Sequence, residues 1–284
     1  MKKTSLKLIL YLVPMLSVLP GLCAANKTNK AVFFDLFAVL IDRKNLRARQ
    51  YIGVGDYLTY AFSGATKNAD LEKRYADFLA KAAEDDPVAS GQQAWYNGRP
   101  ICATMLDWLK GLKTSKELID FLNNYMHEHN DFFLSGTEKK LVTAIISLMR
   151  PEVLSSIMGP VKPMIKVIKD CKQEKNGTHN QVFLLTNWDK ESFDLLKQQK
   201  EHMPMMALFG DDNMILSSEV HMLLPSEELL EYAVKKAGLQ PSDCIIITKE
   251  KENIPAFEKF GMKTILHTST GQTRKELAIY GVLS

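Results

Sequence analysis

The sequence has 284 residues, of which 46% are hydrophobic and 24% are charged. This apolar content suffices for one large α/β domain, or for a core domain with a smaller second one, and it excludes a disordered chain. The formal charge is only +3 and the basic residues are interspersed with acids, so we expect no nucleic-acid partner.

The first segment has the layout of a secretory signal peptide. Three lysines within the first seven residues precede an apolar stretch over residues 8–19, and small residues follow up to Ala25. The stretch contains Pro14 and is short for a membrane span. We expect residues 1–25 to be removed, so that the mature protein is exported, either periplasmic or secreted, with no membrane anchor.

Short apolar runs predict the strands of a parallel sheet. They lie at residues 31–37, 181–186, 244–248 and 263–267. Helix-length amphipathic stretches separate the last three runs, which is the pattern of βα units around such a sheet. Asp35 stands inside the first run, and a carboxylate buried at a strand end needs a partner or a function.

The segment between the first two strands is predicted to be almost entirely helical. Apolar residues recur at helical spacing in four stretches, at residues 71–84, 101–112, 115–129 and 138–149. We expect an all-helical cap domain over residues 45–160, inserted into a core domain of residues 26–44 and 161–284. The cap would lie over the carboxyl ends of the strands, where ligands bind in open α/β sheets.

Four stretches of the chain carry a family resemblance. They are "VFFDLFAVL" at 32–40, "VFLLTNWD" at 182–189, "HMLLPSEELLEYA" at 221–233 and "CIIITKEKEN" at 244–253. In order and spacing, and with the helical insert after the first, they resemble the four motifs of the haloacid dehalogenase (HAD) superfamily of the helical-cap type. The resemblance implies an α/β fold with a HAD-like Rossmannoid parallel-sheet core and an inserted helical cap.

The first two motifs place candidate catalytic residues. The family's first motif ends its strand with a nucleophilic Asp, followed two positions later by an acid in phosphatases or by an aromatic residue in dehalogenases. Asp35 matches the nucleophile and Phe37 the second place, and a phenyl ring cannot protonate a leaving group. The second motif is a Ser or Thr that hydrogen-bonds the transferred group, and Thr186 matches it.

The last two motifs are altered. Leu224 stands before Pro225 where the family has a Lys that offsets negative charge. The family's fourth motif is an acidic pair that holds Mg²⁺, and here Thr248 and Lys249 follow the strand, with Glu250 next. The resemblance implies Mg²⁺ held by Asp35 and Glu250, whereas Lys249 would repel the ion and Glu250 reaches it only from a shifted loop.

Asp35 has two interpretations, a working nucleophile or a structural residue. We hypothesise an ion pair between Asp35 and Lys249, which lies at the end of the neighbouring strand and is then part of the catalytic set. Thr186 also has two interpretations, because a Thr at the end of a strand often caps the next helix.

Three further residues are candidates for substrate binding. Asn187 and Trp188 follow Thr186 directly, and Phe37 follows the nucleophile. Phe37 either faces the substrate or packs in the core.

These features predict an exported HAD-like hydrolase-family protein with a degenerate active site and weak or no phosphatase activity. One alternative is a catalytically inactive HAD-fold protein that acts through its cleft or cap. The other is a metal-independent, dehalogenase-like hydrolase. The expected partner is a small molecule in the cleft between cap and core, or a protein.

Overall fold

A computed structural model describes residues 29–53, 55, 71–88, 95–96, 99–174 and 179–283. The predicted signal peptide, residues 1–25, lies outside these residues.

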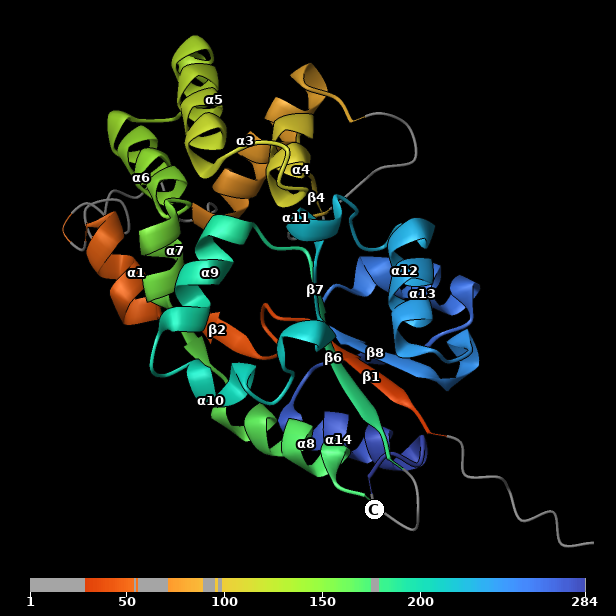
Figure 1. The fold of residues 1–284 in the computed structure, drawn as a ribbon. Coiled ribbons are helices and arrows are strands. Elements are labelled where there is room, and N and C mark those ends of the chain that lie inside the picture. Colours follow the sequence, from red (N-terminus) through yellow and green to blue (C-terminus); the bar gives the residue numbers. More distant parts are fainter. Residues whose placement is uncertain are drawn as a thin grey trace, which may run out of the picture.

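A five-stranded parallel sheet forms the centre of the core, in the order β7-β6-β1-β8-β9 (Figure 1). The strands in that order are Met214–Leu216, Gln181–Thr186, Ala31–Phe34, Cys244–Thr248 and Lys263–Leu266. The four predicted strands are present and the α/β class is confirmed. Sequence analysis missed β7, whose three residues are too few for a recognisable apolar run. Because β1 pairs with both β6 and β8, its carboxyl end lies in the middle of the sheet edge.

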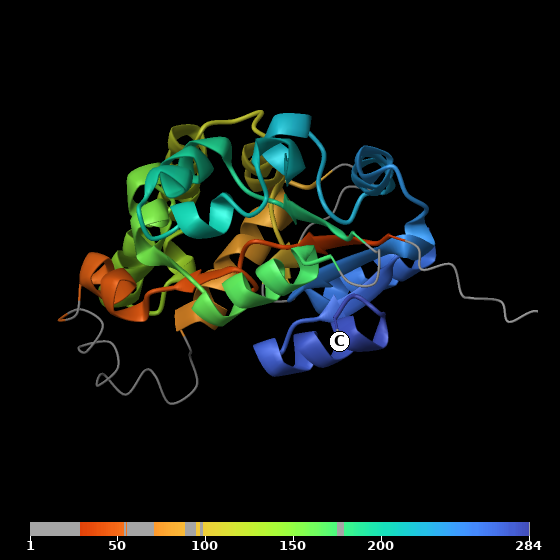
Figure 2. The same cartoon turned by 60° about the horizontal axis from the view of Figure 1, so that its bottom comes forward.

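Both faces of the sheet are buried, as the continuous apolar runs predict. Val32 and Phe34 join one apolar cluster, whereas Ala31 and Phe33 join the other, because successive strand residues point to opposite faces. Two helices cover each face: α8 (Lys162–Lys172) and α14 (Thr270–Ile279) one, α12 (Glu227–Ala237) and α13 (Ile254–Phe260) the other. Figure 2 shows α14 and α12 on opposite sides of the strands.

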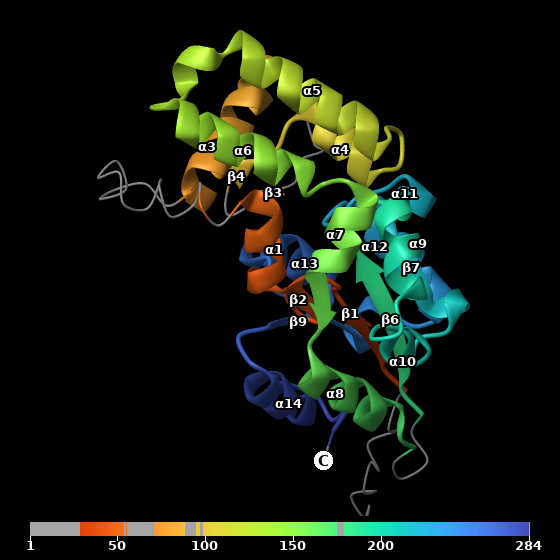
Figure 3. The same cartoon turned by 90° about the vertical axis from the view of Figure 1, so that its left-hand side faces the viewer.

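The cap packs around an apolar cluster of its own and lies above the sheet edge (Figure 3). Its helices are α3 (Leu71–Asp85), α4 (Ala103–Leu109), α5 (Ser115–Glu128) and α6 (Gly136–Ser147). Each coincides with a predicted helical stretch. A short antiparallel pair, β3 (Trp95–Tyr96) with β4 (Arg99–Pro100), joins α3 to α4 and adds strand to a block that was expected to be helical throughout.

The chain leaves and re-enters the core through an antiparallel strand pair. β2 (Ile41–Arg43) pairs with β5 (Met158–Pro160). The predicted domain boundaries, before residue 45 and after residue 160, lie next to this pair. Helices α1 (Asn45–Ile52) and α7 (Pro151–Ile157) flank it on the cap side, and Ala48, Val153 and Ile157 still pack into the apolar cluster of the sheet.

The remaining short elements that the structure describes are three helices of the core and four 3₁₀ turns in core and cap. The helices are α9 (Lys190–Gln198), α10 (Met203–Met206) and α11 (Ser217–Val220). The 3₁₀ turns are Asn130–Phe132 in the cap, and Asp211–Asn213, Pro241–Asp243 and Lys251–Asn253 in the core.

Candidate functional site

Asp35 lies at the carboxyl edge of the sheet, directly after β1. Its backbone N–H donates to the carbonyl of Ile247 at 3.0 Å, so the residue continues the pairing of β1 with β8. The carboxylate accepts three hydrogen bonds: Oδ1 from Thr186 Oγ1 (2.9 Å) and from the N–H of Leu36 (2.8 Å), and Oδ2 from Thr248 Oγ1 (3.1 Å). The side chain is held from β6 on one side and from β8 on the other.

The proposed ion pair between Asp35 and Lys249 is wrong. Lys249 is exposed, and the described groups that contact the Asp35 carboxylate are hydroxyls and a backbone N–H. The physical reason is the two-residue alternation of an extended chain, which turns Thr248 toward Asp35 and leaves the next residue to solvent. Burial raises the pKa of Asp35 to about 6, and the three hydrogen bonds offset only part of this effect.

Thr186 does not cap the following helix, so that interpretation is also wrong. The N-cap of α9 is Asp189, whose Oδ1 accepts from the N–H of Ser192 at 2.8 Å. An Asp is a stronger N-cap than a Thr and stands one residue before the helix. The hydroxyl of Thr186 instead donates to Asp35, whereas the resemblance implies a hydrogen bond to the transferred group.

Asn187 fixes the loop that contains Leu224. Its side-chain Nδ2 donates to the carbonyl of Leu224 at 3.0 Å, and its Oδ1 accepts from the N–H of the same residue at 2.8 Å. Leu224 is buried and lies beside the carboxylate site, where its side chain supplies no charge.

A cavity of about 320 Å³ opens between the cap and the sheet edge. The cap side is apolar; we call six of its side chains the cap wall: Tyr75, Leu79, Met105, Trp108, Ile145 and Met149. The sheet side combines apolar and polar side chains; we call the three carboxylates there the acidic floor: Asp35, Asp189 and Glu250. Pockets for small molecules have this composition, with apolar walls and a few convergent polar groups, and this one is at the small end of their range of about 300 to 1,000 Å³.

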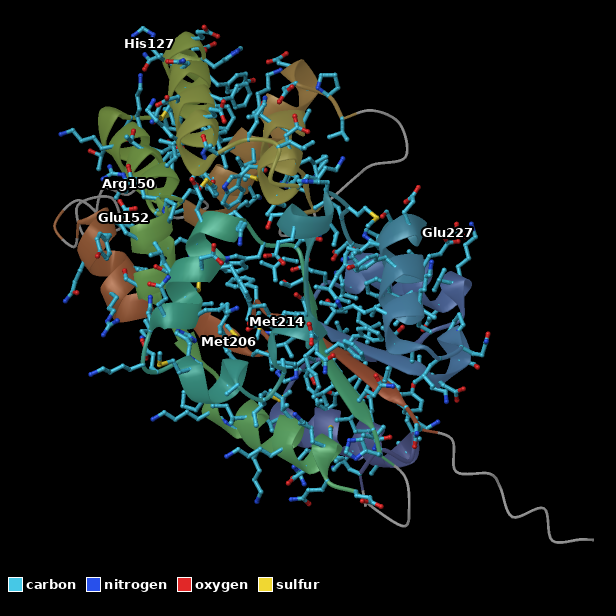
Figure 4. All side chains as sticks on the ribbon, viewed as in Figure 1. His127, Arg150, Glu152, Met206, Met214 and Glu227 are labelled. Carbon is cyan, nitrogen blue, oxygen red and sulfur yellow. The ribbon has the colours of Figure 1, made fainter. Side chains whose placement is uncertain are left out.

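All three predicted substrate-binding residues line this cavity. Phe37 and Trp188 lie with their ring centroids 6.2 Å apart, and Asn187 lies beside them. Phe37 is half-buried and also packs against the apolar cluster of the sheet, and its contact with a substrate stays a prediction. Not every polar residue of the cap belongs to this site. His127 of α5 is exposed at the outer end of the cap, far from the sheet (Figure 4).

The fold of this chain matches solved structures. No family model and no curated protein matches the sequence. The HAD family enzyme bt-2542 from Bacteroides thetaiotaomicron is 15% identical with a TM-score of 0.50, over 89% of this chain and 99% of that chain. The chain has a HAD-like fold.

Two further HAD structures are similar to this chain. One is bt-2542 in complex with magnesium, at 16% identity and TM-score 0.49, over 85% of this chain and 94% of that chain. The other is the L-2-haloacid dehalogenase RSc1362, at 13% identity and TM-score 0.44, over 84% of this chain and 85% of that chain.

Glu250 is the second acid near Asp35 in this HAD-like fold. It is half-buried and lines the cavity, and its N–H donates to Thr248 Oγ1 at 3.1 Å. Burial raises the pKa of Glu250 to about 7, with further contributions from the negative charges of Asp35 and Glu252. The 3₁₀ turn after β8 thus brings Glu250 to the site, one residue beyond the exposed Lys249.

These donors fit a resident Mg²⁺ poorly. Among the residues that the structure describes, no three His, Cys, Asp or Glu side chains are grouped to hold a metal ion. The Asp35 carboxylate already accepts three hydrogen bonds, which leaves it little room to bind a metal ion. Of the Asp35 and Glu250 pair, only Glu250 has a carboxylate without a described hydrogen bond. Mg²⁺ demands near-octahedral oxygen ligands, and this pair supplies few of them.

The cap is tied to the core on the side of α9 and α11. Ser217 Oγ donates to the carbonyl of Leu109 at 2.6 Å, and the N–H of Ser115 donates to Glu191 at 3.1 Å. Gly111 has φ +69°, and a Cβ there would lie 2.5 Å from the carbonyl oxygen of Ser218. Only a glycine allows the two backbones to approach this closely.

Sequence reasoning missed three polar residues of the cavity. Asp189 carried a signal, since it stands three residues before a Ser at a helix start. Arg43 and Asn253 carried none, because their places depend on the β2–β5 pair and on the turn after β8.

Across the described ranges, no helix is both long enough and apolar enough to cross a bilayer.

Proposed function

We propose that this HAD-fold protein binds a small, largely apolar molecule between cap and sheet and has little or no phosphatase activity. The observation that carries this proposal is the contrast within one cavity, in which an apolar cap wall faces three carboxylates and the described lining includes a single basic residue, Arg43. The HAD-like fold is retained, but Phe37, Leu224 and Lys249 stand where the resemblance implies an acid, a Lys and a metal-binding acid in phosphatases.

Phosphoryl transfer depends on positive charge around the transferred group. Leu224 supplies none, and Lys249 points to solvent. A phosphate would instead meet the carboxylates of Asp35 and Glu250, which repel it. We therefore expect no dependence on Mg²⁺, although bt-2542 has been solved with that ion.

A second candidate function is a metal-independent hydrolase with Asp35 as nucleophile. It is favoured by the position of Asp35, which lines the cavity and is held by Thr186 and Thr248. The aromatic residue Phe37 two positions later also matches the dehalogenase form of the first motif. Haloacid turnover that Asp35→Asn abolishes is the outcome that would favour this candidate.

The signal-peptide layout supports a further part of the proposal, that the mature protein is exported. We infer that it acts outside the cytoplasm without nucleic acid, and without a membrane anchor once residues 1–25 are removed. A cleaved amino terminus near Asn26, found by mass spectrometry of the exported protein, tests this part; a retained segment contradicts it.

The binding proposal is tested by a thermal-shift screen of the mature protein against small molecules of mixed polarity. Ile145 is a half-buried residue that lines the cavity, so Ile145→Trp should fill it and remove the shift caused by any hit. Ile119 is a half-buried residue of α5 outside the cavity, and Ile119→Trp should leave the shift unchanged. A shift that survives Ile145→Trp would place the ligand elsewhere and contradict the proposal.

A further inference from the structure

The charges around the cavity are uneven. Three carboxylates line it, those of Asp35, Asp189 and Glu250, and Arg43 is the basic residue among the described lining side chains. An anionic ligand would approach more negative than positive charge. A cationic ligand would offset part of the negative charge at a site where burial weakens screening by water.

Asp189 is the most deeply buried carboxylate of the acidic floor. Asp189 is 3% exposed, and its Oδ2 is buried with no partner in the described part of the chain, whereas its Oδ1 caps α9. A buried carboxylate oxygen without a donor costs free energy. Because this oxygen is enclosed by protein atoms, Asp189 adds negative charge beside the cavity and does not offer an acceptor to a ligand.

Aromatic rings surround the same space. Phe37 and Trp188 line the sheet side, and Tyr75 and Trp108 belong to the cap wall. The faces of such rings attract organic cations, with Trp the strongest, and their apolar area also accommodates a hydrocarbon body. The cavity therefore combines carboxylates and aromatic rings, the two groups that bind ammonium ions in proteins.

We propose that the ligand is an amphiphilic organic cation, with its ammonium group on the acidic floor and its apolar body against the cap wall. This inference rests on the proposed binding function and names the chemical class of the ligand. Burial raises the pKa of Asp35 to about 6 and that of Glu250 to about 7, and a bound cation would favour the ionised form of both groups.

The test compares three ligands of one size that differ only in the polar group: 3-phenylpropan-1-amine, 3-phenylpropan-1-ol and 3-phenylpropanoate. Isothermal titration calorimetry at pH 8, where Asp35 and Glu250 are ionised, should give a Kd for the amine at least tenfold below that of the alcohol, and the weakest binding for the carboxylate. A tenfold difference corresponds to about 1.4 kcal/mol.

A charge-neutral variant shows whether the acidic floor causes the preference. Glu250→Gln should reduce the advantage of the amine over the alcohol about tenfold, because it removes one negative charge from the acidic floor while no described hydrogen bond depends on the Glu250 side chain. Glu231→Gln, the same substitution at an exposed acid of α12, should change neither affinity. Circular dichroism of both variants checks that they are folded.

The outcomes separate this inference from the proposed function. Equal affinities for amine and alcohol, or tightest binding of the carboxylate, would overturn the cationic ligand and leave a binding cavity in place. An amine preference that survives Glu250→Gln would also overturn it. Binding of none of the three ligands would overturn both proposals.

Discussion

Cap and core each hold a carboxylate within the fold, but the groups that contact it differ in charge. In the cap, Glu138 is 1% exposed and pairs with Arg74 at 2.5 Å, and the N–H of Leu134 donates to its other oxygen at 2.9 Å. In the core, the described hydrogen bonds to the Asp35 carboxylate come from Thr186, Leu36 and Thr248, and all three donors are uncharged. The charge of Glu138 is compensated within the fold by Arg74. The donors to Asp35 are uncharged, so its negative charge can interact with a ligand in the cavity.

The largest effect is expected from breaking the cap pair. Glu138→Ala leaves Arg74 partly buried with only the carbonyl of Phe132 as its described hydrogen-bond partner, and it should lower the free energy of unfolding by about 3 kcal/mol. Hydrogen exchange should show the loss of protection in the cap. Glu128→Ala, at an exposed acid of α5, should cost less than about 0.5 kcal/mol. Equal costs for the two variants would contradict a structural role for Glu138.

The hydroxyls around Asp35 should contribute the next largest effect. Thr186→Val removes a donor to an ionised carboxylate and should lower the free energy of unfolding by about 2 kcal/mol at pH 8, whereas Thr186→Ser should cost less. The cost should shrink at pH 5, below the pKa of about 6, because Asp35 is then protonated. A cost that is independent of pH would indicate lost packing rather than a lost hydrogen bond to the carboxylate.

Glu250 should destabilise the fold at alkaline pH. Its pKa is raised to about 7 from 4.5, so the folded state holds the proton more tightly than the unfolded state does. Stability from this group is therefore full below pH 4.5 and lost as the pH rises through 7. Glu250→Gln should raise the free energy of unfolding by about 1 kcal/mol at pH 8, and by nothing at pH 4, in urea titrations at the two pH values. A gain of equal size at both pH values would contradict this.

Lys249 should contribute the smallest effect. Lys249→Ala removes an exposed charge with no described contact to Asp35, so the melting temperature should stay within the change expected from about 0.5 kcal/mol. A large loss of stability in Lys249→Ala that is absent in Lys249→Arg would instead support an ion pair between Lys249 and Asp35.

Sequence reasoning reached the framework because the framework depends on local patterns. The apolar runs that became β1, β6, β8 and β9 and the helical periodicity of α3 to α6 are visible in short windows. Asp35, Thr186 and Glu250 were found because each follows a strand, and parallel strands end at one edge of the sheet.

The parts that sequence did not predict depend on pairing between distant segments. Whether Thr248 or Lys249 faces Asp35 is decided by the register of β8 against β1. The place of Arg43 in the cavity depends on the β2–β5 pair, and the approach of Gly111 to Ser218 depends on how the cap docks. The hydrophobic periodicity of the segments involved predicts none of these contacts.

The central claim is that the site lacks the Lys charge that the HAD resemblance implies for phosphate chemistry, because the buried Leu224 stands in its place. The most direct test is the rate of p-nitrophenyl phosphate hydrolysis by the mature protein, with and without Mg²⁺, compared with Asp35→Asn. We predict a rate that Mg²⁺ does not raise and that Asp35→Asn does not lower. A Mg²⁺-dependent rate that Asp35→Asn abolishes would contradict the claim and show that Asp35 and Glu250 form a working phosphatase site.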